Sequence, residues 1–568
     1  MVHDLRAICL NLKTWRISRR FFLKSGALLS SLPLAATAAH AADPAATASR
    51  QVGPAPVRTT PVSDYIVDGF KVNPSAPIVL KGRRDLTLDV YRKVVWNHTP
   101  VSVDPAALKQ IDAWRKEFLD FLAVHPELNV YGVNIKPGDA HKQRLTEEEL
   151  KQNLSQGLNT GISFGEPLPN RVVRGIILAR TSGMLGGNSA SSAALTSHII
   201  GMLGRKELPV VPREGQGGAG EVCPLGTLFD NIPREIHLGL KEPMTIINGH
   251  PTATALCVDL ALRSDGIIKL TEQVLALAID GLTAPSEHFG VQLEACWDDP
   301  DEQKALQNIR AYLKDAPVPR RQNVQARVTV RDIPLILAAA YKAQRNLKQI
   351  AQTVLQSSHD NPLWIPKDQA AKVGAEPYVC SNGSYHSQIA MNAPDEIARN
   401  YADLATVLYS LVQCYYSDPV AMPGLDNLIY GNMQMNASDW QDETRMLGQP
   451  SLLPPPQFGQ NDLCSPYMRA WNKVDRLEKV LAALDAQVAC MASESIFIRG
   501  DLKTSPALQP MLDIIRKFNP PIDVAKGDRR TIATELDGLY NFMADSAMAY
   551  SSLDPEKRPA LVLQTIKF

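Results

Sequence analysis

One segment of this chain is rich in glycine, which lets the backbone approach a ligand closely. Glycines crowd residues 129–248, and the densest group is Gly217, Gly218 and Gly220 around Ala219. Glycine permits close approach of the backbone to another molecule. If this group opens a helix, its backbone N–H groups are free to bind a carboxylate or an oxyanion. The group is therefore the first candidate for a functional site.

Side chains that bind metals lack the necessary spacing. The eleven histidines contain no His-x-x-x-His or His-Glu-x-x-His pattern, so we expect no metal site. Cys9 lies in an N-terminal segment that we expect to be removed, and the other cysteines form no Cys-x-x-Cys pair. They are scattered at Cys223, Cys257, Cys296, Cys380, Cys414, Cys464 and Cys490. We therefore expect no disulfide framework.

Long amphipathic patterns indicate the elements that would position such a site. They span roughly residues 332–357, 395–417, 465–492 and 529–552. An earlier helix should begin after Asp104-Pro105, where apolar residues recur at steps of three and four. Strand signals are confined to short runs such as Val172-Val173 and Lys241 to Ile247. The sequence predicts a mainly α fold, a long-helix bundle with a loop-rich N-terminal domain.

The N-terminus predicts export. Ser18-Arg19-Arg20-Phe21-Phe22-Leu23-Lys24 precedes an apolar run and the small-residue site Ala39-His40-Ala41, which is typical of a twin-arginine signal peptide. We expect the twin-arginine translocase as a transient partner and a periplasmic location. No later stretch reaches about 18 uninterrupted apolar residues, so no membrane segment is predicted.

Composition sets the domain boundaries and excludes some partners. We divide the chain into a signal (1–41), a flexible leader (42–82) rich in Ala, Pro and Thr, an N-terminal active-site domain (83–305) and a helical bundle (306–568). Removal of the signal leaves a net charge near −5. Such a charge argues against nucleic acid or an anionic membrane as a partner.

Collinear motifs from Tyr131 to Leu363 carry a resemblance to a known family. They include Tyr131-Gly132-Val133-Asn134, Gly165-Glu166-Pro167-Leu168-Pro169, Lys241-Glu242, Ile247-Asn248-Gly249 and Asp360-Asn361-Pro362-Leu363. The chain resembles the histidine and phenylalanine ammonia-lyases over roughly residues 80–560. The resemblance implies a mostly helical homotetramer, related in architecture to fumarase and aspartase, whose active sites combine loops of three subunits.

The resemblance also locates the family's prosthetic group. Ammonia-lyases cyclise an Ala-Ser-Gly triplet and dehydrate its serine to a methylidene-imidazolone electrophile. Aligned on Pro224-Leu225, that triplet becomes Gly218-Ala219-Gly220 in this chain. The methyl of Ala219 has no leaving group, and Cys223 is followed by Pro224, which has no N–H to attack a carbonyl. We therefore expect no such cofactor.

Other family positions are partly kept. The resemblance implies Tyr131 as general base, Asn248 beside the prosthetic group and Arg331 as the grip on a substrate carboxylate. It further implies substrate-binding positions at Gly157, Leu158, Gln325, Gln457 and Asn461. The family's second tyrosine and its aspartate are replaced by Val328 and Ala326. These losses argue against ammonia elimination as the family performs it.

Each of these residues also has a structural interpretation. Tyr131 could also be a packed tyrosine, although its motif favours a site role. Arg331 could form an ion pair at a helix start, and Asn248 could form a turn before Gly249. Gly157 either enlarges a pocket or permits a close helix contact. Two functions remain open: a lyase or a related elimination, addition or cyclisation enzyme acting on a carboxylate-bearing, aromatic or other small molecule, and an inactive protein that binds such a carboxylate.

Overall fold

A computed structural model describes most of the chain after residue 56. The described ranges are 57–158, 160–316, 325–417, 430–454, 459–500, 502–523, 526–528 and 530–567. The predicted signal, the first part of the predicted leader and Gln457 lie outside these ranges. The folded unit begins at Val57, and no boundary near residue 305 divides it.

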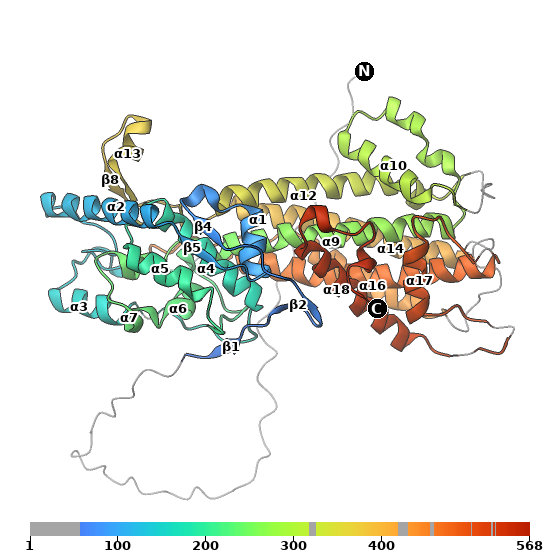
Figure 1. Cartoon of the computed structure of the whole chain (residues 1–568), viewed down its shortest axis with the longest axis horizontal. Coiled ribbons are helices and arrows are strands. Elements are labelled where there is room, and N and C mark those ends of the chain that lie inside the picture. The colour runs from blue at the N-terminus through green and yellow to red at the C-terminus, as the bar shows by residue number, and fades with distance from the viewer. Residues whose placement is uncertain are drawn as a thin grey trace, which may run out of the picture. The chain divides into compact units, whose positions relative to one another are not determined.

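Five long helices form the core of this unit (Figure 1). They are α9 (Pro251–Gly281), α12 (Ile333–Leu355), α14 (Ile389–Ser417), α16 (Tyr467–Ile498) and α18 (Ala533–Ser552). Helix α9 packs against α16, α18, α12 and α4 (Asn170–Leu185), and α14 packs against α16 and α12. Four of the five coincide with the patterns found in the sequence, which confirms the mainly helical prediction.

The sequence patterns did not reveal α9, although it is the central helix. All of its residues except Asp265 and Lys269 are buried. A helix that is covered on every side carries no apolar stripe, so its sequence has no amphipathic period. It lies within the range predicted as the N-terminal domain, yet it packs in the bundle. The most apolar window of α16, which is long enough to cross a membrane, is 83% buried inside the unit.

The described strands are short and occur in pairs. They are β1 (Thr59–Pro61) with β6 (Glu207–Pro209), β2 (Tyr65–Val67) with β3 (Phe70–Lys71), β4 (Ile78–Leu80) with β5 (Val101–Val103), and β7 (Leu363–Ile365) with β8 (Tyr378–Cys380). Only the β4–β5 pair is parallel. Strands β1 to β4 belong to the range predicted as a leader, but β1 and β4 pair with later strands, so residues 57–82 are part of the folded body.

The prediction of strands at Val172-Val173 and at Lys241 to Ile247 is wrong. Val172-Val173 lies in α4, and the run up to Ile247 forms α8 (Glu242–Ile247). Helix α4 is buried along almost its whole length, so its β-branched residues reflect burial and not a strand. In α8 a proline stands in the first turn, where its fixed φ favours a helix start.

The remaining described α-helices lie beside this core or at one end of it (Figure 1). They are α1 (Leu88–Tyr91), α2 (Pro105–Val124), α3 (Glu147–Gln156), α5 (Ala193–Met202), α6 (Val222–Phe229), α7 (Ile232–Glu235), α10 (Pro300–Leu313), α11 (Val328–Arg331), α13 (Lys367–Ala370), α15 (Met433–Leu447) and α17 (Gln509–Phe518). Helix α2 begins as predicted, because the Asp104 carboxylate accepts a hydrogen bond from the backbone N–H of Ala106 at 2.7 Å.

Candidate active site

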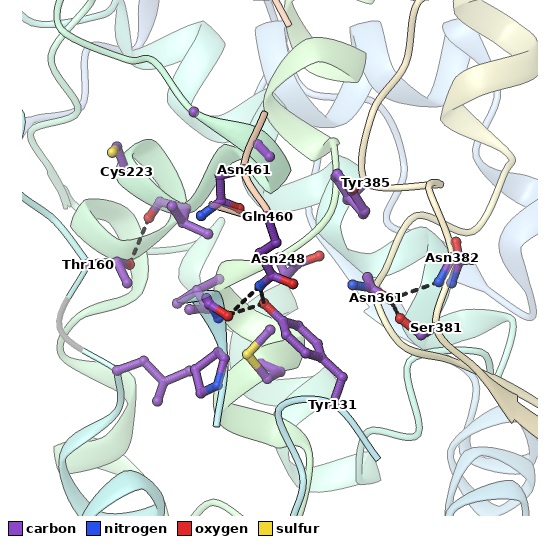
Figure 2. Close-up of a pocket in the computed structure, with 18 of the residues that line it drawn as sticks. Tyr131, Thr160, Cys223, Asn248, Asn361, Ser381, Asn382, Tyr385, Gln460 and Asn461 are labelled. Carbon is purple, nitrogen blue, oxygen red and sulfur yellow. Dashed lines mark hydrogen bonds between the residues drawn. The ribbon is translucent and has the colours of Figure 1, made fainter. Parts of the chain in front are cut away.

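A cavity of about 580 Å³ gathers loops that are far apart in the sequence. Figure 2 shows its labelled side chains converging from several segments. It is lined by Tyr131, Pro137, Gly138, Leu158, Thr160, Gly217, Gly218, Ala219, Val222, Cys223, Met244, Ile247, Asn248, Asn361, Ser381, Asn382, Tyr385, Gln460 and Asn461. None of these described lining residues carries a formal charge. The predicted site residues Tyr131, Leu158, Gly218, Ala219, Asn248 and Asn461 all lie here.

The glycine group lies directly before a helix but does not begin it. Gly218 has φ +99° and Gly220 has φ +71°, a short 3-10 turn covers Ala219–Glu221, and α6 begins at Val222 with Glu221 as its N-cap. A Cβ at Gly220 would lie 2.7 Å from the side-chain nitrogen of Asn248, so this position requires glycine both for its conformation and for space. Gly220 therefore supports the wall of the cavity from behind, while the Ala219 methyl lines it.

Asn248 presents an unused acceptor at this cavity. The residue is only 7% exposed, and its backbone carbonyl accepts a hydrogen bond from a guanidinium nitrogen of Arg180. Its side-chain Oδ1 has no hydrogen-bond partner within the described part of the chain. A buried amide oxygen without a partner is costly, which favours a ligand that donates a hydrogen bond to it.

A buried ionic cluster holds Asn248 in place. The Oδ2 atom of Asp360 lies 3.1 Å from Nη2 of Arg180 and 2.9 Å from Nζ of Lys241, and all three side chains are at most 1% exposed. Burial lowers the pKa of Lys241, while Asp360 opposes this shift. Lys241 and Asp360 appeared in sequence motifs without a role. The cluster now explains them, because it fixes the carbonyl behind the cavity wall.

The hydroxyl oxygen of Tyr131 accepts hydrogen bonds from two donors at the cavity. Its Oη accepts a hydrogen bond from the backbone N–H of Gly138 at 2.9 Å and from Nε2 of Gln460 at 3.4 Å. Figure 2 shows the ring of Tyr131 pointing toward Gln460 at the cavity. These two contacts hold the hydroxyl of Tyr131 at the cavity, so Tyr131 is part of the candidate site and not only a packed side chain.

Glu221 ties the glycine loop to the start of α9. Its carboxylate accepts hydrogen bonds from the backbone N–H groups of Thr252 at 2.6 Å and Ala253 at 2.8 Å. Burial raises the pKa of Glu221 to about 8, although these hydrogen bonds act in the opposite direction. Glu221 also adopts φ +54°, a left-handed conformation that is unfavourable for a side chain of this kind. These contacts position the loop that carries Ala219.

The opposite wall was missed by sequence reasoning. Asn361 is 8% exposed, and its Oδ1 accepts hydrogen bonds from Oγ of Ser381 at 3.2 Å and the backbone N–H of Asn382 at 3.0 Å. Tyr385 completes this wall, and Thr160 lines the cavity beside α6. Asn361 belonged to a motif, but the others are single polar residues on loops and carry no pattern that could have identified them.

Leu158 and Gly157, both proposed as substrate-binding positions, have different roles in the structure. Leu158 lines the cavity, but Gly157 does not. Gly157 ends α3 with φ +73°, and a Cβ there would lie 3.0 Å from Pro233 on α7. Gly157 therefore permits a close helix contact, the structural alternative that the sequence left open.

Arg331 does not line the cavity of its own chain. With its amide oxygen facing the guanidinium, Gln325 accepts hydrogen bonds from Nη1 and Nη2 of Arg331 at 2.9 and 3.2 Å. The neighbouring Ala326 bonds to His288, which follows the C-terminal end of α9. The cavity lies at the other end of α9, whose 31 residues span about 45 Å. Arg331 can therefore reach such a cavity only in another copy of the chain.

A metal centre finds no support in the described ranges. They contain no group of three or more His, Cys, Asp or Glu side chains placed to hold an ion. The seven cysteines after the N-terminal segment are free thiols. What the arrangement offers chemically is a tyrosine hydroxyl and an unpaired amide oxygen, that of Asn248.

Comparison with known proteins places this geometry in a family. The model of the aromatic amino acid lyases matches residues 86–232 and 230–517. Histidine ammonia-lyase of Geobacillus thermodenitrificans is 25% identical over 491 residues, which cover 78% of this chain and 94% of that enzyme. Histidine ammonia-lyase of Gloeobacter violaceus is 25% identical over 505 residues, which cover 81% and 94%.

Solved structures agree on the fold. Ergothionase from Treponema denticola, an ergothioneine-degrading enzyme, has a TM-score of 0.72 at 18% identity and covers 83% of this chain and 99% of its own. Phenylalanine aminomutase from Pantoea agglomerans has a TM-score of 0.72 at 19% identity, with coverage of 83% and 99%. The chain belongs to the aromatic amino acid lyase family.

Proposed function

We propose that this lyase-family protein is an enzyme that works without a methylidene-imidazolone group. The observation that carries the proposal is Ala219, whose methyl lines the cavity where the family's dehydrated serine is expected. A methyl cannot be eliminated, and the nearby thiol of Cys223 is followed by Pro224, whose nitrogen cannot cyclise. The residues present do not fit the prosthetic group.

The loss of that electrophile limits the substrate. A positioned general base contributes about 10²- to 10⁴-fold, whereas enzymes generally lower barriers by about 8 kcal/mol or more. Tyr131 alone is therefore too weak to expel a free amine, and the substrate must already carry an activated leaving group. A quaternary ammonium meets this requirement, because it has no N–H to lose to a base, keeps its positive charge, and departs as a neutral tertiary amine. Ergothioneine, the substrate of one structural neighbour, is a betaine of this kind.

The proposed step is a β-elimination. The phenolate of Tyr131 takes the β-proton, the electron pair of that C–H bond forms the new double bond, and the pair of the C–N bond leaves with the nitrogen. Addition and cyclisation use the same base on other activated substrates. The unpaired amide oxygen of Asn248 orients the substrate by accepting a hydrogen bond from it.

The carboxylate of the substrate would be gripped by Arg331 of a second copy. The described cavity contains no cation of its own, and Arg331 lies at the far end of α9. We therefore propose a homotetramer with composite sites. Light scattering that shows a monomer at micromolar concentration would contradict this part of the proposal.

The absence of the prosthetic group has a direct test. The intact mass of the purified protein should equal the mass expected from its sequence, and the methylidene-imidazolone absorbance should be absent. A mass lower by two waters would overturn the proposal.

Turnover is measured as release of trimethylamine from α-trimethylammonium betaines of histidine and phenylalanine, with the free amino acids as controls. The betaines alone should react, and Tyr131→Phe should abolish the reaction.

A binding protein is the second candidate function. It is favoured by Ala219 and by Val328, which stands where the resemblance places a second active-site tyrosine and is 59% exposed. In that case a cinnamate-like acid binds the wild type and Tyr131→Phe equally, and no betaine or amino acid is converted. Loss of turnover with retained binding in Tyr131→Phe identifies the enzyme instead.

We also propose export to the periplasm by the twin-arginine translocase. The support is the ordered run from Ser18 to Lys24 in the sequence. Replacement of Arg19 and Arg20 by lysine should retain the protein in the cytoplasm of a bacterial host, as measured by fractionation. Unchanged periplasmic yield would refute this assignment.

A further inference from the structure

A second cavity, of about 650 Å³, lies in the C-terminal half and shares no lining residue with the first. It opens where α15 and α18 flank α16. It is lined by Asn432, Met433, Asn436, Trp440, Ala483, Ala486, Gln487, Arg530, Thr531, Ile532, Ala533, Leu536, Asp537 and Tyr540. Its volume is within the range of small-molecule sites, about 300–1,000 Å³. Neither the family assignment nor the proposed function uses it.

One face of α16 forms the floor of this cavity. Ala483, Ala486 and Gln487 are spaced three and four residues apart, and the two alanine methyls leave room above the helix. Gln487 is 3% exposed, and its Nε2 donates a hydrogen bond to Oδ1 of Asn436. Its Oε1 has no partner among the described residues. The floor thus offers a desolvated acceptor that a ligand O–H or N–H group can satisfy.

The walls are aromatic. Trp440 comes from α15 and Tyr540 from α18, so the two flanking helices each supply one ring. The indole N–H of Trp440 already donates to Oδ1 of Asn436 at 3.0 Å, which fixes the orientation of that ring. Paired aromatic walls over an apolar floor favour a ligand with an aromatic body.

The mouth of the cavity carries unneutralised negative charge. Arg530 lines the cavity, but it is paired with Asp528 and, at 3.3 Å, with Glu535. The carboxylate of Asp537 is exposed and has no hydrogen bond or ion pair within the described ranges. An ammonium group is the natural partner for this carboxylate. The ring of Trp440 already has the guanidinium of Arg476 at 5.4 Å from its centre, so the ligand's cation is assigned to Asp537 alone.

We propose that this cavity binds an arylalkylamine whose ring carries a hydrogen-bond donor. The ring lies between Trp440 and Tyr540, its donor bonds to Oε1 of Gln487 at the floor, and its ammonium pairs with Asp537 at the mouth. No covalent step is involved. The site is independent of the lyase cavity and of whether that cavity is catalytic.

Four matched probes test the three contacts by calorimetry on the full chain. Tyramine has both the hydroxyl and the ammonium, phenethylamine lacks the hydroxyl, tyrosol lacks the charge, and 3-(4-hydroxyphenyl)propionate reverses it. Tyramine should bind about three- to fivefold more tightly than tyrosol, the ratio that an exposed ion pair supports. It should bind about tenfold more tightly than phenethylamine, as a hydrogen bond to a buried acceptor supports. The propionate should bind most weakly.

Variants assign each difference to one residue. Asp537→Asn should remove the advantage of tyramine over tyrosol, and Gln487→Met should remove its advantage over phenethylamine. Ala483→Leu fills the floor and should abolish binding of all the probes. Asp442→Asn, an exposed change on α15 that does not line the cavity, is the control and should leave all affinities unchanged.

Three outcomes would overturn the proposal. Equal affinity for the cationic, neutral and anionic probes would remove the role of Asp537. Binding that survives Ala483→Leu would place the probes elsewhere, the lyase cavity included. Failure of every probe to bind would mean that the cavity is closed in the assembled protein, for example by a second copy of the chain.

Discussion

Asp360→Asn should be among the most destabilising single changes near the site. Asp360 is 0% exposed and its Oδ2 contacts both Arg180 and Lys241, which are themselves at most 1% exposed. Asparagine keeps the shape but removes the charge that both cations face. Breaking a buried ion pair by removing one partner costs about 3–5 kcal/mol. That is a large part of a native stability of about 5–15 kcal/mol.

The loss should depend on pH, and its sign follows from Lys241. Burial already lowers the pKa of Lys241, and Asp360 is the group that opposes this shift. Without Asp360 the folded pKa falls further below that of the unfolded chain. The unfolded state then binds more protons in the alkaline range, so the stability of the variant rises with pH. The gap between wild type and Asp360→Asn should therefore narrow toward pH 10.

Differential scanning fluorimetry from pH 7 to 10 measures this, with Asp442→Asn as an exposed control. Midpoints are compared by rank, because a chain of this length is not expected to unfold in two states. The double variant Asp360→Asn/Lys241→Met removes one of the two cations that the single change leaves without an anion. It should therefore lose less stability than the two single variants lose together, by about 1 kcal/mol or more. A midpoint for Asp360→Asn equal to that of Asp442→Asn, or strict additivity in the double variant, would refute the reasoning.

Three further predictions concern the lyase cavity. Arg331→Lys should weaken binding of a cinnamate-like acid by about 1.5–3 kcal/mol in calorimetry, because lysine cannot make the bidentate contact; no loss would sink its assignment. Gly220→Ala should destabilise the protein by about 1–3 kcal/mol and disturb Asn248. Gly217→Ala should not, because a Cβ at Gly217 would have no neighbouring atom within 4 Å. Thermal midpoints of the two variants distinguish these effects. Burial raises the pKa of Glu221 to about 8, so the folded protein keeps a proton that the unfolded chain has already released, and the stability of the wild type falls as the pH rises toward 8. Glu221→Gln should therefore flatten the fall of the thermal midpoint between pH 5 and 8. Parallel midpoint curves for the wild type and the variant would contradict this.

Local patterns were enough to predict most of the bundle. Helices α12, α14 and α18 and the first half of α16 each present one buried and one more exposed face, and that alternation is visible in the residues themselves. The Asp104 cap marked the start of α2 for the same reason, because it acts within one turn. The collinear motifs likewise identified Tyr131, Asn248, Ala219, Leu158 and Asn461, which the fold brings to one cavity.

Other features were decided by tertiary structure alone. Helix α9 has no exposed face, so only its packing against α4, α12, α16 and α18 identifies it. Val172-Val173 has strand propensity but lies in a helix, because burial outweighs local preference. Ser381, Asn382 and Tyr385 reach the cavity through the path of one loop, which no spacing rule encodes.

The position of Arg331 shows most clearly what the sequence of one chain cannot predict. The family resemblance assigned Arg331 to the substrate site, yet in one chain it lies near the C-terminal end of α9 and the cavity lies near the N-terminal end, and the 31 residues of α9 span about 45 Å. Sequence spacing reports positions along one chain and contains no information on which copy supplies a residue. The sequence by itself therefore determined the family, the helices with a polar face and the chemistry of the glycine loop. Only the tertiary structure decided which groups meet, because burial and contact depend on segments that the chain brings together from far apart.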